Sequence, residues 1–412
     1  MDYGLIGCPL GHSFSPMLHG LIAEYSYELC ELPPQELERF LRDRHFRGIN
    51  VTIPYKQAVL PYLDEISPAA ARIGAVNTIV NRGGKLCGYN TDYAGMSALL
   101  THMGAVLAGK KVLILGTGGT SRTAHAVAAA HGAAEILHVS RSGRDGAVDY
   151  DAAVSIHRDA HFLINTTPVG MYPKVEGCPL HPSALAKPEG ILDAVYRPLR
   201  TNLVLEGQSL GIPAQGGLYM LAAQAVHASA LFTGIESRAE TIGTAYRALL
   251  RQQRNLVLIG MPSCGKSTVG RLLSAALRKP FVDTDERIAA HVGMPVSDFL
   301  RQVGEPRFRQ VEAEIVARSA MENGLVLATG GGVVLDPANR SALKRNGLVI
   351  FLDRSPDKLV ATPDRPLSSD RAALLARYEE RYPLYRAAAD LTVDADGTPE
   401  SVAQAILEAW NA

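Results

Sequence analysis

Residues 256–267 read LVLIGMPSCGKS, and residues 111–124 read KVLILGTGGTSRTA. In both stretches an apolar run leads into a glycine-rich turn, which a segment rich in Ala or Leu follows. Apolar runs without polar alternation are typical of parallel strands that are buried on both faces. A strand, a glycine-rich turn and a helix form the repeating unit of doubly wound proteins. The sequence therefore predicts two α/β regions with parallel sheets.

The composition is that of an ordinary globular protein, long enough for two or three domains. The chain has 412 residues, of which 47% are hydrophobic and 20% charged, and its 41 basic residues balance 41 acidic ones. With no net charge we expect no binding to nucleic acid or membrane, so anionic ligands must be held by local clusters. No apolar run approaches the roughly 18 residues of a membrane helix. We expect no secretory signal peptide, because strand-like residues follow Met1 directly.

The cysteines indicate a reducing environment. The five of them lie far apart, and no two form a C-x-x-C pair. We therefore expect neither a zinc site nor a disulfide framework, and we expect the protein to be cytoplasmic. The sequence leaves open whether the chain is a monomer or a small homo-oligomer.

Strand and helix patterns divide the chain into segments, with no low-complexity stretch and no repeat of fixed period. Residues 1–100 carry strands of their own, and 101–216 hold the first glycine-rich unit. Residues 217–250 are predicted as helices that return to the first segment. A short linker is expected at 251–255, before a domain at 256–412.

The turn at residues 260–267 fits the phosphate-binding pattern G-x-x-x-x-G-K-[ST], and it stands between a predicted strand and a predicted helix. Backbone N–H groups of such a loop point at phosphate oxygens. Lys266 would neutralise the β- and γ-phosphates, and Ser267 would offer its hydroxyl to Mg²⁺. The pattern indicates a nucleotide, with ATP as the expected one, but says nothing of a second substrate.

The residues that follow narrow the choice. Asp283 and Asp285 stand two apart at a probable strand end, so we expect them on one side of the strand. The later motifs are GEPRFRQVE at 304–312, GGG at 330–332, RPL at 365–367 and RYPLY at 381–385. In this order the motifs resemble those of shikimate kinase, over nearly all of the second half.

The resemblance implies roles for individual residues of the second half. Asp285 would orient or deprotonate the 3-hydroxyl of shikimate, and Lys266 and Arg309 would also act in catalysis. Shikimate would be bound by Asp285, Arg309, Gly331, Gly332 and Arg381. Mg²⁺ would be bound by Ser267 and Asp283. ATP would be bound by Ser263, Cys264, Gly265, Lys266, Ser267, Thr268 and Arg365.

Two residues of the phosphate loop raise questions of their own. Many members of the family have Gly where Ser263 stands, so the loop is expected to approach phosphate slightly differently here. Cys264 is either a reactive thiol at a helix N-terminus or a small residue that fills space.

The first glycine-rich turn, at 116–119, is of the type that binds a dinucleotide. NAD enzymes usually place an acidic residue at the end of the next strand, where it binds the ribose 2′-hydroxyl. The present chain instead reads Ser140-Arg141-Ser142-Gly143-Arg144 after that strand. Two arginines suit a 2′-phosphate, which favours NADP(H) over NAD.

The leading segment supplies polar groups suited to a small acid. It contains SFS at 13–15, NVTIPYK at 50–56 and NTD at 90–92. Together with the dinucleotide turn, these motifs resemble shikimate dehydrogenase across residues 1–235. The resemblance implies that Lys56 gives a proton to the new alkoxide and that Asp92 holds Lys56. Substrate would be bound by Ser13, Ser15, Thr52, Asn77, Tyr196 and Gln224. NADP would be bound by Gly116, Gly118, Gly119, Ser140, Arg141, Ser142, Arg144, Thr166 and Gly217.

The two resemblances share one small molecule, shikimate, because one activity makes it and the other consumes it. We therefore expect a bifunctional enzyme of aromatic amino-acid biosynthesis with separate, outward-open sites and small-molecule partners. One alternative is a first half that acts on quinate or uses NAD. Another is a metabolite sensor built on enzyme-like domains. The sensor is disfavoured because the catalytic groups are all present and no basic segment is visible.

Overall fold

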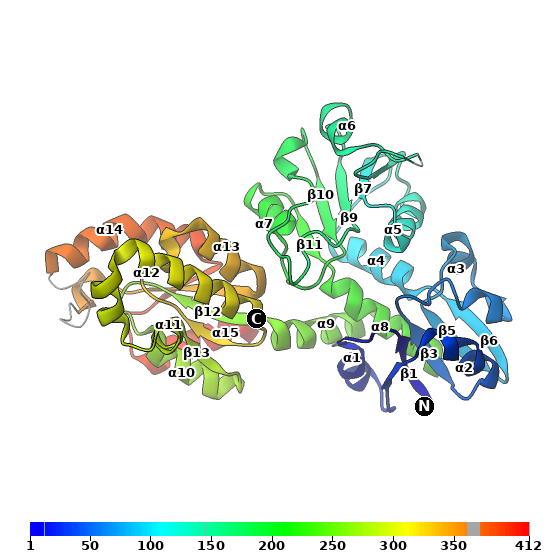
Figure 1. The fold of residues 1–412 in the computed structure, drawn as a ribbon, viewed down its shortest axis with the longest axis horizontal. Helices are drawn as coiled ribbons and strands as arrows, with labels where there is room; N and C mark the ends of the chain where they lie inside the picture. The colour runs from blue at the N-terminus through cyan, green and yellow to red at the C-terminus, as the bar shows by residue number, and fades with distance from the viewer. Residues whose placement is uncertain (12, 145, 361–370, 412) are drawn as a thin grey trace. The chain divides into compact units, whose positions relative to one another are not determined.

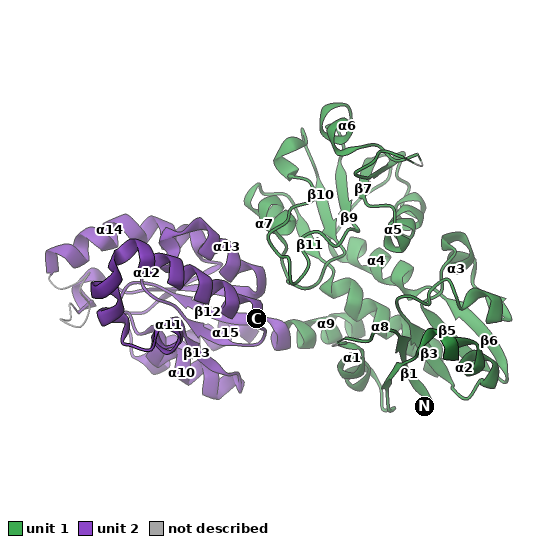
Figure 2. Ribbon diagram, in the orientation of Figure 1, with its two compact units in different colours: residues 1–250 green, residues 251–412 purple. Residues whose placement is uncertain are grey.

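The computed structural model describes residues 1–11, 13–144, 146–360 and 371–411. The chain forms two compact units, Met1–Leu250 and Arg251–Ala412 (Figure 2). Both are α/β, as predicted (Figure 1). Among the described residues, no helix is both long and apolar enough to cross a membrane.

The first sheet of the first unit is mixed, with the strand order β2-β1-β3-β5-β6-β4. Its neighbours are parallel except at β3–β5 and β5–β6, which are antiparallel. The strands are β1 (Tyr3–Gly7), β2 (Glu28–Glu31), β3 (Gly48–Val51), β4 (Glu65–Ile66), β5 (Thr78–Arg82) and β6 (Lys85–Tyr89). Three α-helices connect them: α1 (Ser15–Ile22), α2 (Leu37–Asp43) and α3 (Pro68–Ile73), with 3₁₀ turns at Pro34–Glu36 and Leu60–Tyr62.

The second sheet of this unit is parallel throughout, with the order β11-β10-β9-β7-β8. Its strands are β7 (Lys111–Leu115), β8 (Glu135–Val139), β9 (Phe162–Asn165), β10 (Gly190–Asp193) and β11 (Ala214–Gly216). Its helices are α5 (Gly119–Ala130), α6 (Tyr150–Ser155) and α7 (Asn202–Ser209), with a 3₁₀ turn at Pro182–Ala184. Because the strands are parallel, the loops after them gather at one edge of the sheet.

The two faces of β7 belong to two different cores. Val112 and Ile114 pack in a cluster that includes α4 (Thr91–His102), α5 and α8 (Leu218–Thr233). Leu113 and Leu115 pack in a second cluster, with α6 and α7. Successive side chains of a strand point to opposite faces, so an apolar run of this kind needs helices on both sides. The prediction of a buried parallel strand here is confirmed.

The expected linker at 251–255 is not a separate segment. Helix α9 spans Ala239–Gln253, and strand β12 begins at Asn255. The polar residues near the end of α9 are compatible with a helix, because Arg and Gln are good helix formers and need no burial. Polarity alone therefore did not distinguish the end of a helix from a linker.

The second unit has one parallel sheet, with the order β13-β14-β12-β15-β16. Its strands are β12 (Asn255–Ile259), β13 (Phe281–Asp283), β14 (Val326–Ala328), β15 (Gly347–Asp353) and β16 (Leu391–Asp394). Its helices are α10 (Lys266–Leu277), α11 (Thr284–Val292), α12 (Val296–Met321), α13 (Pro337–Asn346), α14 (Arg371–Ala388) and α15 (Pro399–Asn411), with 3₁₀ turns at Val333–Leu335 and Pro356–Lys358.

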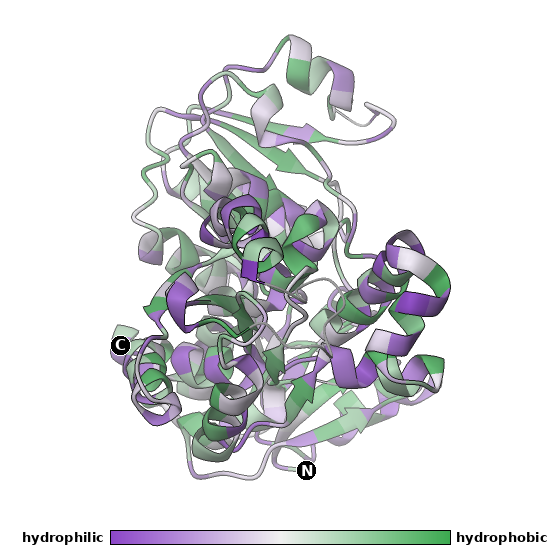
Figure 3. Ribbon diagram, turned by 90° about the vertical axis from the view of Figure 1, so that its left-hand side faces the viewer, coloured by the Kyte–Doolittle hydropathy of each residue, from purple (hydrophilic) through white to green (hydrophobic). Residues whose placement is uncertain are grey.

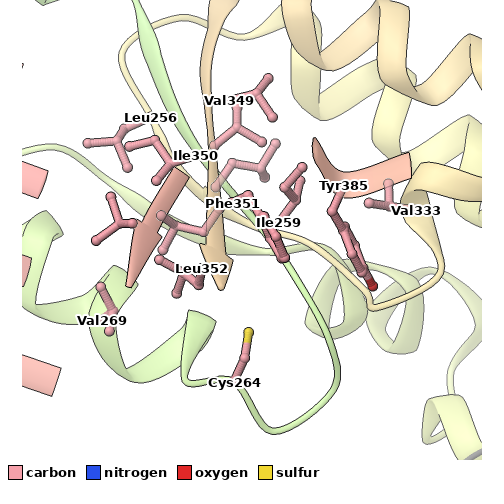
Figure 4. Close-up of a cluster of buried hydrophobic side chains, with 14 of the residues drawn as sticks. Leu256, Ile259, Cys264, Val269, Val333, Val349, Ile350, Phe351, Leu352 and Tyr385 are labelled. Atoms are coloured by element: carbon pink, nitrogen blue, oxygen red, sulfur yellow. The ribbon is translucent and has the colours of Figure 1, made fainter. Parts of the chain in front are cut away.

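Strands β12 and β15 form the centre of the core of the second unit, as Figure 4 shows. Every residue of β12 is buried. Phe351 of β15 stacks on Tyr385 of α14, with ring centroids 5.0 Å apart. Each fully buried side chain of this size contributes about 1.5–3 kcal/mol. Across the molecule, hydrophobic residues gather on the strands (Figure 3).

Candidate active sites

A cavity of about 270 Å³ opens in the first unit. Its wall comes from the loop after β1, from β3 and the loop after it, from the start of α4, from α8 and from the loop after β10. Many of the predicted substrate residues meet there although they are far apart in sequence. The predicted residues that line it are Ser13, Ser15, Thr52, Lys56, Asp92, Tyr196, Gly217 and Gln224.

Lys56 and Asp92 form an ion pair in this cavity. The Lys56 Nζ lies 2.6 Å from Asp92 Oδ2, and the second oxygen of Asp92 accepts a hydrogen bond from the Gln224 amide. Asn90 fixes the start of α4 by accepting a 3.1 Å hydrogen bond from the Tyr93 N–H. The side chains of Lys56 and Asp92 are 31% and 13% exposed, respectively. An ammonium held in this way can bind a substrate oxygen and give it a proton.

The two serines of the first motif lie side by side. Ser13 Oγ and Ser15 Oγ are 3.1 Å apart, and the Ser15 N–H donates to Ser13 Oγ at the start of α1. Tyr196 completes this wall, with its ring 6.1 Å from that of Phe14 in an edge-on contact. Two hydroxyls and a phenol on one wall suit a carboxylate or several ring hydroxyls.

Asn77 was expected to bind substrate, but it is not among the residues that line the cavity. Its side-chain oxygen accepts hydrogen bonds from the Thr91 N–H at 2.7 Å and from the Thr91 and Thr78 hydroxyls, both at 3.2 Å. The side chain therefore supports the start of α4. Sequence spacing could not reveal this role, because Asn77 and Thr91 become neighbours only through the β5–β6 hairpin.

Asn50 and His19 line the cavity but were not predicted as site residues. Asn50 accepts from the Tyr27 hydroxyl at 2.7 Å and donates to Thr78 Oγ1 at 3.0 Å. His19 stacks on Tyr27, with centroids 3.9 Å apart. Burial lowers the pKa of His19 to about 3, so it stays neutral at physiological pH. Asn50 could have been found, because it stands in the same motif as Lys56.

The predicted cofactor residues follow the carboxyl ends of the parallel strands. Gly116 follows β7 with a φ of +109°, and a Cβ there would lie 2.9 Å from the Thr166 hydroxyl. Thr166 follows β9 and donates to the Leu115 carbonyl at 2.6 Å. Helix α5 begins next, with Gly118 at its N-cap and Gly119 as its first residue. A glycine-rich turn before a helix N-terminus suits a pyrophosphate.

The residues that distinguish NADP from NAD follow β8, the neighbour of β7. Ser140 Oγ accepts a 3.1 Å hydrogen bond from the Gly143 N–H, which shapes this turn. Arg141, Ser142 and Arg144 are exposed. Two guanidinium groups at this position can approach a phosphate on the ribose.

A larger cavity, of about 590 Å³, lies in the second unit above the phosphate loop. The predicted residues that line it are Ser263, Gly265, Lys266, Ser267, Thr268, Asp283, Asp285, Arg309, Gly331, Gly332 and Arg381. Ser263 has a φ of +65°, a left-handed conformation that glycine adopts more easily. The loop therefore keeps the backbone shape that Gly would favour at this position.

Lys266 is folded back onto its own loop. Its Nζ donates to the carbonyls of Gly260 and Met261, both at 2.9 Å, and the residue is only 9% exposed. Nearby, Ser267 Oγ donates to Asp283 Oδ2 at 2.6 Å. Hydroxyl and carboxylate oxygens are the ligands that Mg²⁺ prefers, so this pair fits the predicted metal.

Asp283 and Asp285 do face one cavity, but not because both lie on a strand. Asp283 ends β13 and caps α11, accepting a 3.0 Å hydrogen bond from the Asp285 N–H. Asp285 is already in the first turn of the helix. The expected strand alternation is therefore wrong for Asp285, because the cap at Asp283 bends the chain into a helix.

Arg309 lies on α12 beyond the break at Gly304, which has a φ of +76°. It pairs with Glu312 at 2.7 Å and with Glu305 at 2.9 Å. Burial raises the pKa of Glu312, although the Arg309 charge opposes the shift. Glu312 lines the cavity and was not predicted, although its place three residues after Arg309 puts it on the same helix face.

The triple-glycine turn brings backbone close to these side chains. A Cβ at Gly332 would collide with the guanidinium of Arg309. The Gly331 carbonyl accepts from Arg381 at 3.1 Å and from the buried Tyr385 hydroxyl. Arg381 Nε is buried and has no hydrogen-bond partner among the residues that the structure describes.

Residues 5–79 match the family model of the shikimate dehydrogenase substrate binding domain. A shikimate dehydrogenase (NADP(+)) of Halothermothrix orenii is 40% identical over 262 residues, which cover 57% of this chain and 91% of the relative. The chain belongs to the shikimate dehydrogenase family. Residues 262–411 match the shikimate kinase family model, so a shikimate kinase domain follows the dehydrogenase.

Solved structures agree with this assignment for the dehydrogenase part. Shikimate 5-dehydrogenase from Thermus thermophilus, in complex with NADP(H) and shikimate, matches with a TM-score of 0.55 and 33% identity, covering 60% of this chain and 99% of that one. A chorismate mutase/shikimate 5-dehydrogenase fusion protein from Clostridium acetobutylicum matches with a TM-score of 0.57 and 32% identity, covering 60% and 96%. The chain is therefore an enzyme that joins an oxidoreductase to a transferase.

Two predictions in the kinase domain need comment. Cys264 was expected among the ATP-binding residues, but it is 1% exposed and packs in the core beneath the loop (Figure 4). Its side chain therefore fills space, because the loop needs its backbone toward phosphate and its small side chain inward. Arg365, predicted to bind ATP, lies outside the described residues.

Proposed function

We propose that the first unit reduces 3-dehydroshikimate to shikimate with NADPH, and that the second phosphorylates the 3-hydroxyl of shikimate with ATP. One oxygen atom would thus be created as a hydroxyl at the first site and phosphorylated at the second. The observation that carries the proposal is a series of two hydrogen bonds, from Lys56 to Asp92 and from Gln224 to Asp92. These side chains line one cavity with Ser13 and Ser15.

In the dehydrogenase, we assign the proton to Lys56 Nζ. NADPH, when bound, supplies the hydride. Lys56 then protonates the alkoxide that forms from the ketone, while Asp92 holds the ammonium by a charge-assisted hydrogen bond. Ser13 and Ser15 would bind the substrate carboxylate. The 13% exposure of Asp92 supports this role, because exclusion of water strengthens the pair.

The preference for NADPH rests on Arg141 and Arg144. They are exposed just beyond β8, where an NAD enzyme would place a carboxylate. The relatives from H. orenii and Clostridium beijerinckii are also named as NADP(+) enzymes. Residues 101–216 would form the cofactor domain, and residues 1–100 with 217–250 would form the substrate domain.

In the kinase, Asp285 would orient or deprotonate the shikimate hydroxyl, and Arg309 and Arg381 would bind its carboxylate. Planar guanidinium groups suit this because each can make two parallel hydrogen bonds to a carboxylate. Lys266 would leave the loop carbonyls for the phosphates of ATP. Ser267 and Asp283 would hold Mg²⁺, which supplies charge neutralisation for phosphoryl transfer.

The location and assembly of the protein stay predictions. The five cysteines, all of them free, support a reducing, cytoplasmic location. We propose small molecules as the partners and a monomer or small homo-oligomer as the assembly.

A single reaction mixture tests the proposal. The full chain is given 3-dehydroshikimate, NADPH, ATP and Mg²⁺, and both NADPH oxidation and ADP release are followed. We expect ADP release to follow NADPH oxidation and to stop when NADPH is omitted. NADPH loss without ADP would refute the kinase assignment, and ADP release only on added shikimate would refute the dehydrogenase. Replacing the substrate pair by quinate with NAD⁺ or NADP⁺ tests the alternative specificity.

A further inference from the structure

We propose that Cys178, His181 and Glu206 form a binding site for Zn²⁺ in the parallel-sheet part of the first unit. One ligand atom from each lies within 4.8 Å of the others. Across the described part of the chain, this is the one group of three or more such side chains. The proposal revises the expectation of no zinc site and is independent of the two proposed activities.

The geometry needs only a small rearrangement of the three side chains to bind an ion. Four ligands around tetrahedral Zn²⁺, each at 2.0–2.3 Å, lie roughly 3.3–3.8 Å apart. His181 Nδ1 and Glu206 Oε2 are already 2.7 Å apart and would separate slightly around the ion. The chain supplies one sulfur, one nitrogen and one oxygen ligand, a mixture that suits Zn²⁺ better than Mg²⁺ or Ca²⁺. The fourth position faces water, since the His181 side chain is 67% exposed.

Neighbouring groups hold the ligands in place. Glu206 Oε1 accepts from the Ser183 hydroxyl at 2.8 Å and from the Ser183 N–H at 3.3 Å, which leaves Oε2 directed at His181. Hydrogen bonds of this kind orient metal ligands in known sites. Pro179 and Pro182 flank the loop positions and restrict the backbone between Cys178 and His181. Cys178 also packs against the α6–α7 core.

The sulfur ligand selects a soft ion at this site. Zn²⁺ and Co²⁺ bind thiolate ligands readily, whereas Mg²⁺ prefers oxygen, so we expect Zn²⁺ and Co²⁺ but not Mg²⁺ to bind Cys178.

The site has a structural use. Residues 166–189 connect β9 to β10 and include only one short 3₁₀ turn. Connections without regular structure rarely exceed about 12–15 residues in compact domains. A bound ion would join this connection to α7, because Glu206 comes from that helix. The same connection begins at Thr166, beside the dinucleotide turn.

The test is a Co²⁺ titration of the full chain after treatment with a chelator. A Co²⁺–thiolate bond has a near-ultraviolet charge-transfer band, which oxygen ligands at the phosphate loop do not produce. We expect a band that saturates at one equivalent and is lost when Zn²⁺ is added, because Zn²⁺ binds such sites more tightly than Co²⁺. Zn²⁺ should also raise the Tm of the protein by mass action.

Variants decide whether these residues are the ligands. Cys178→Ser should remove the band, His181→Gln and Glu206→Gln should each weaken binding at least tenfold, and Ser183→Ala about tenfold. The matched control is Cys30→Ser, since Cys30 is also half-buried and near the carboxylates of Glu28 and Glu36 but belongs to no such group in the described part of the chain.

The proposal is overturned if the wild-type chain gives no thiolate band, or if Cys178→Ser keeps it. It is also overturned if His181→Gln binds Co²⁺ as tightly as the wild type. The His181 side chain is exposed, so we expect this variant to fold, and circular dichroism checks that it does. In those cases the three side chains are only a hydrogen-bonded surface cluster.

Discussion

The two lysines at the two candidate sites are held in opposite ways. Lys56 is paired with a carboxylate from another element, and it faces the cavity with 31% of its side chain exposed. Lys266 lies nearly buried on two carbonyls of its own loop. In the proposed reactions, the first is already arranged to deliver a proton. The second would exchange neutral carbonyls for the stronger attraction of phosphate oxygens.

The difference suits the roles that we propose for the two lysines. A proton donor must be held in one position beside the carbonyl oxygen, which carries little charge before reaction. A phosphate-binding lysine has only to meet a large negative charge, so its resting position can differ from its bound one. The groups that hold Lys56 therefore come from distant parts of the fold, whereas the groups that hold Lys266 belong to one turn.

The largest effect should come from replacing each of the two lysines in turn. Lys266→Ala should lower the rate of ADP release by about 10³-fold or more, because it removes a charge that stabilises the transferred phosphoryl group. Lys56→Ala should lower kcat for NADPH oxidation by about 10²- to 10⁴-fold. Each reaction is measured separately with its own substrates, and each variant serves as the control for the other.

The comparison fails if either variant loses both activities while circular dichroism shows an intact fold. Mixing the two variants adds a further test of separate sites. We expect the mixture to make shikimate 3-phosphate with an initial rise of free shikimate. Much slower production by the mixture than by the intact chain, together with no free shikimate from the intact chain, would instead indicate transfer between sites.

A smaller effect concerns the pH dependence of stability in the first unit. His19 has a folded pKa of about 3 and an ordinary value of 6.5. Between these pH values the unfolded chain binds a proton that the folded chain does not, so stability is lost as the pH falls below 6.5. At pH 5 the loss is about 2 kcal/mol. His19→Gln should not show this loss. The difference in unfolding free energy between wild type and variant should therefore become about 2 kcal/mol smaller from pH 7 to pH 5.

Urea unfolding followed by circular dichroism measures this gap. Trp410, the only tryptophan, lies in the second unit, so its fluorescence reports that unit separately. Asp193, whose pKa burial raises to about 6, acts in the opposite direction, but it is present in both proteins and cancels. A gap that does not change with pH would contradict the prediction.

The smallest effect should be on cofactor choice. Arg141→Ala should lower kcat/KM for NADPH about tenfold, because one charge-assisted hydrogen bond to an exposed phosphate is lost. The value for NADH should hardly change. Arg158→Ala is the matched control. Arg158 is also exposed, but it precedes β9 and so lies near the amino ends of the parallel strands, whereas Arg141 follows the carboxyl end of β8. An equal loss with NADPH and NADH would show that Arg141 does not read the 2′-phosphate.

Much of the fold and of both sites could be predicted because the decisive patterns are local. An apolar run, a glycine-rich turn and a helix start are written in consecutive residues, and β7 and β12 formed where they were expected. The residues that follow parallel strands must meet at one edge of the sheet, whatever the details of packing. Lys56 and Asp92 were predicted from the family resemblance that local motifs of the leading segment carry.

What the sequence alone determined was therefore the two α/β units, their glycine-rich turns and many of the polar residues that line the cavities. Only the tertiary structure decided which way individual side chains point. It turned Asn77 toward Thr91, placed Cys264 in the core and set Glu312 beside Arg309. It also brought Glu206 of α7 to His181. These arrangements depend on packing between distant segments, and no local pattern carries that information.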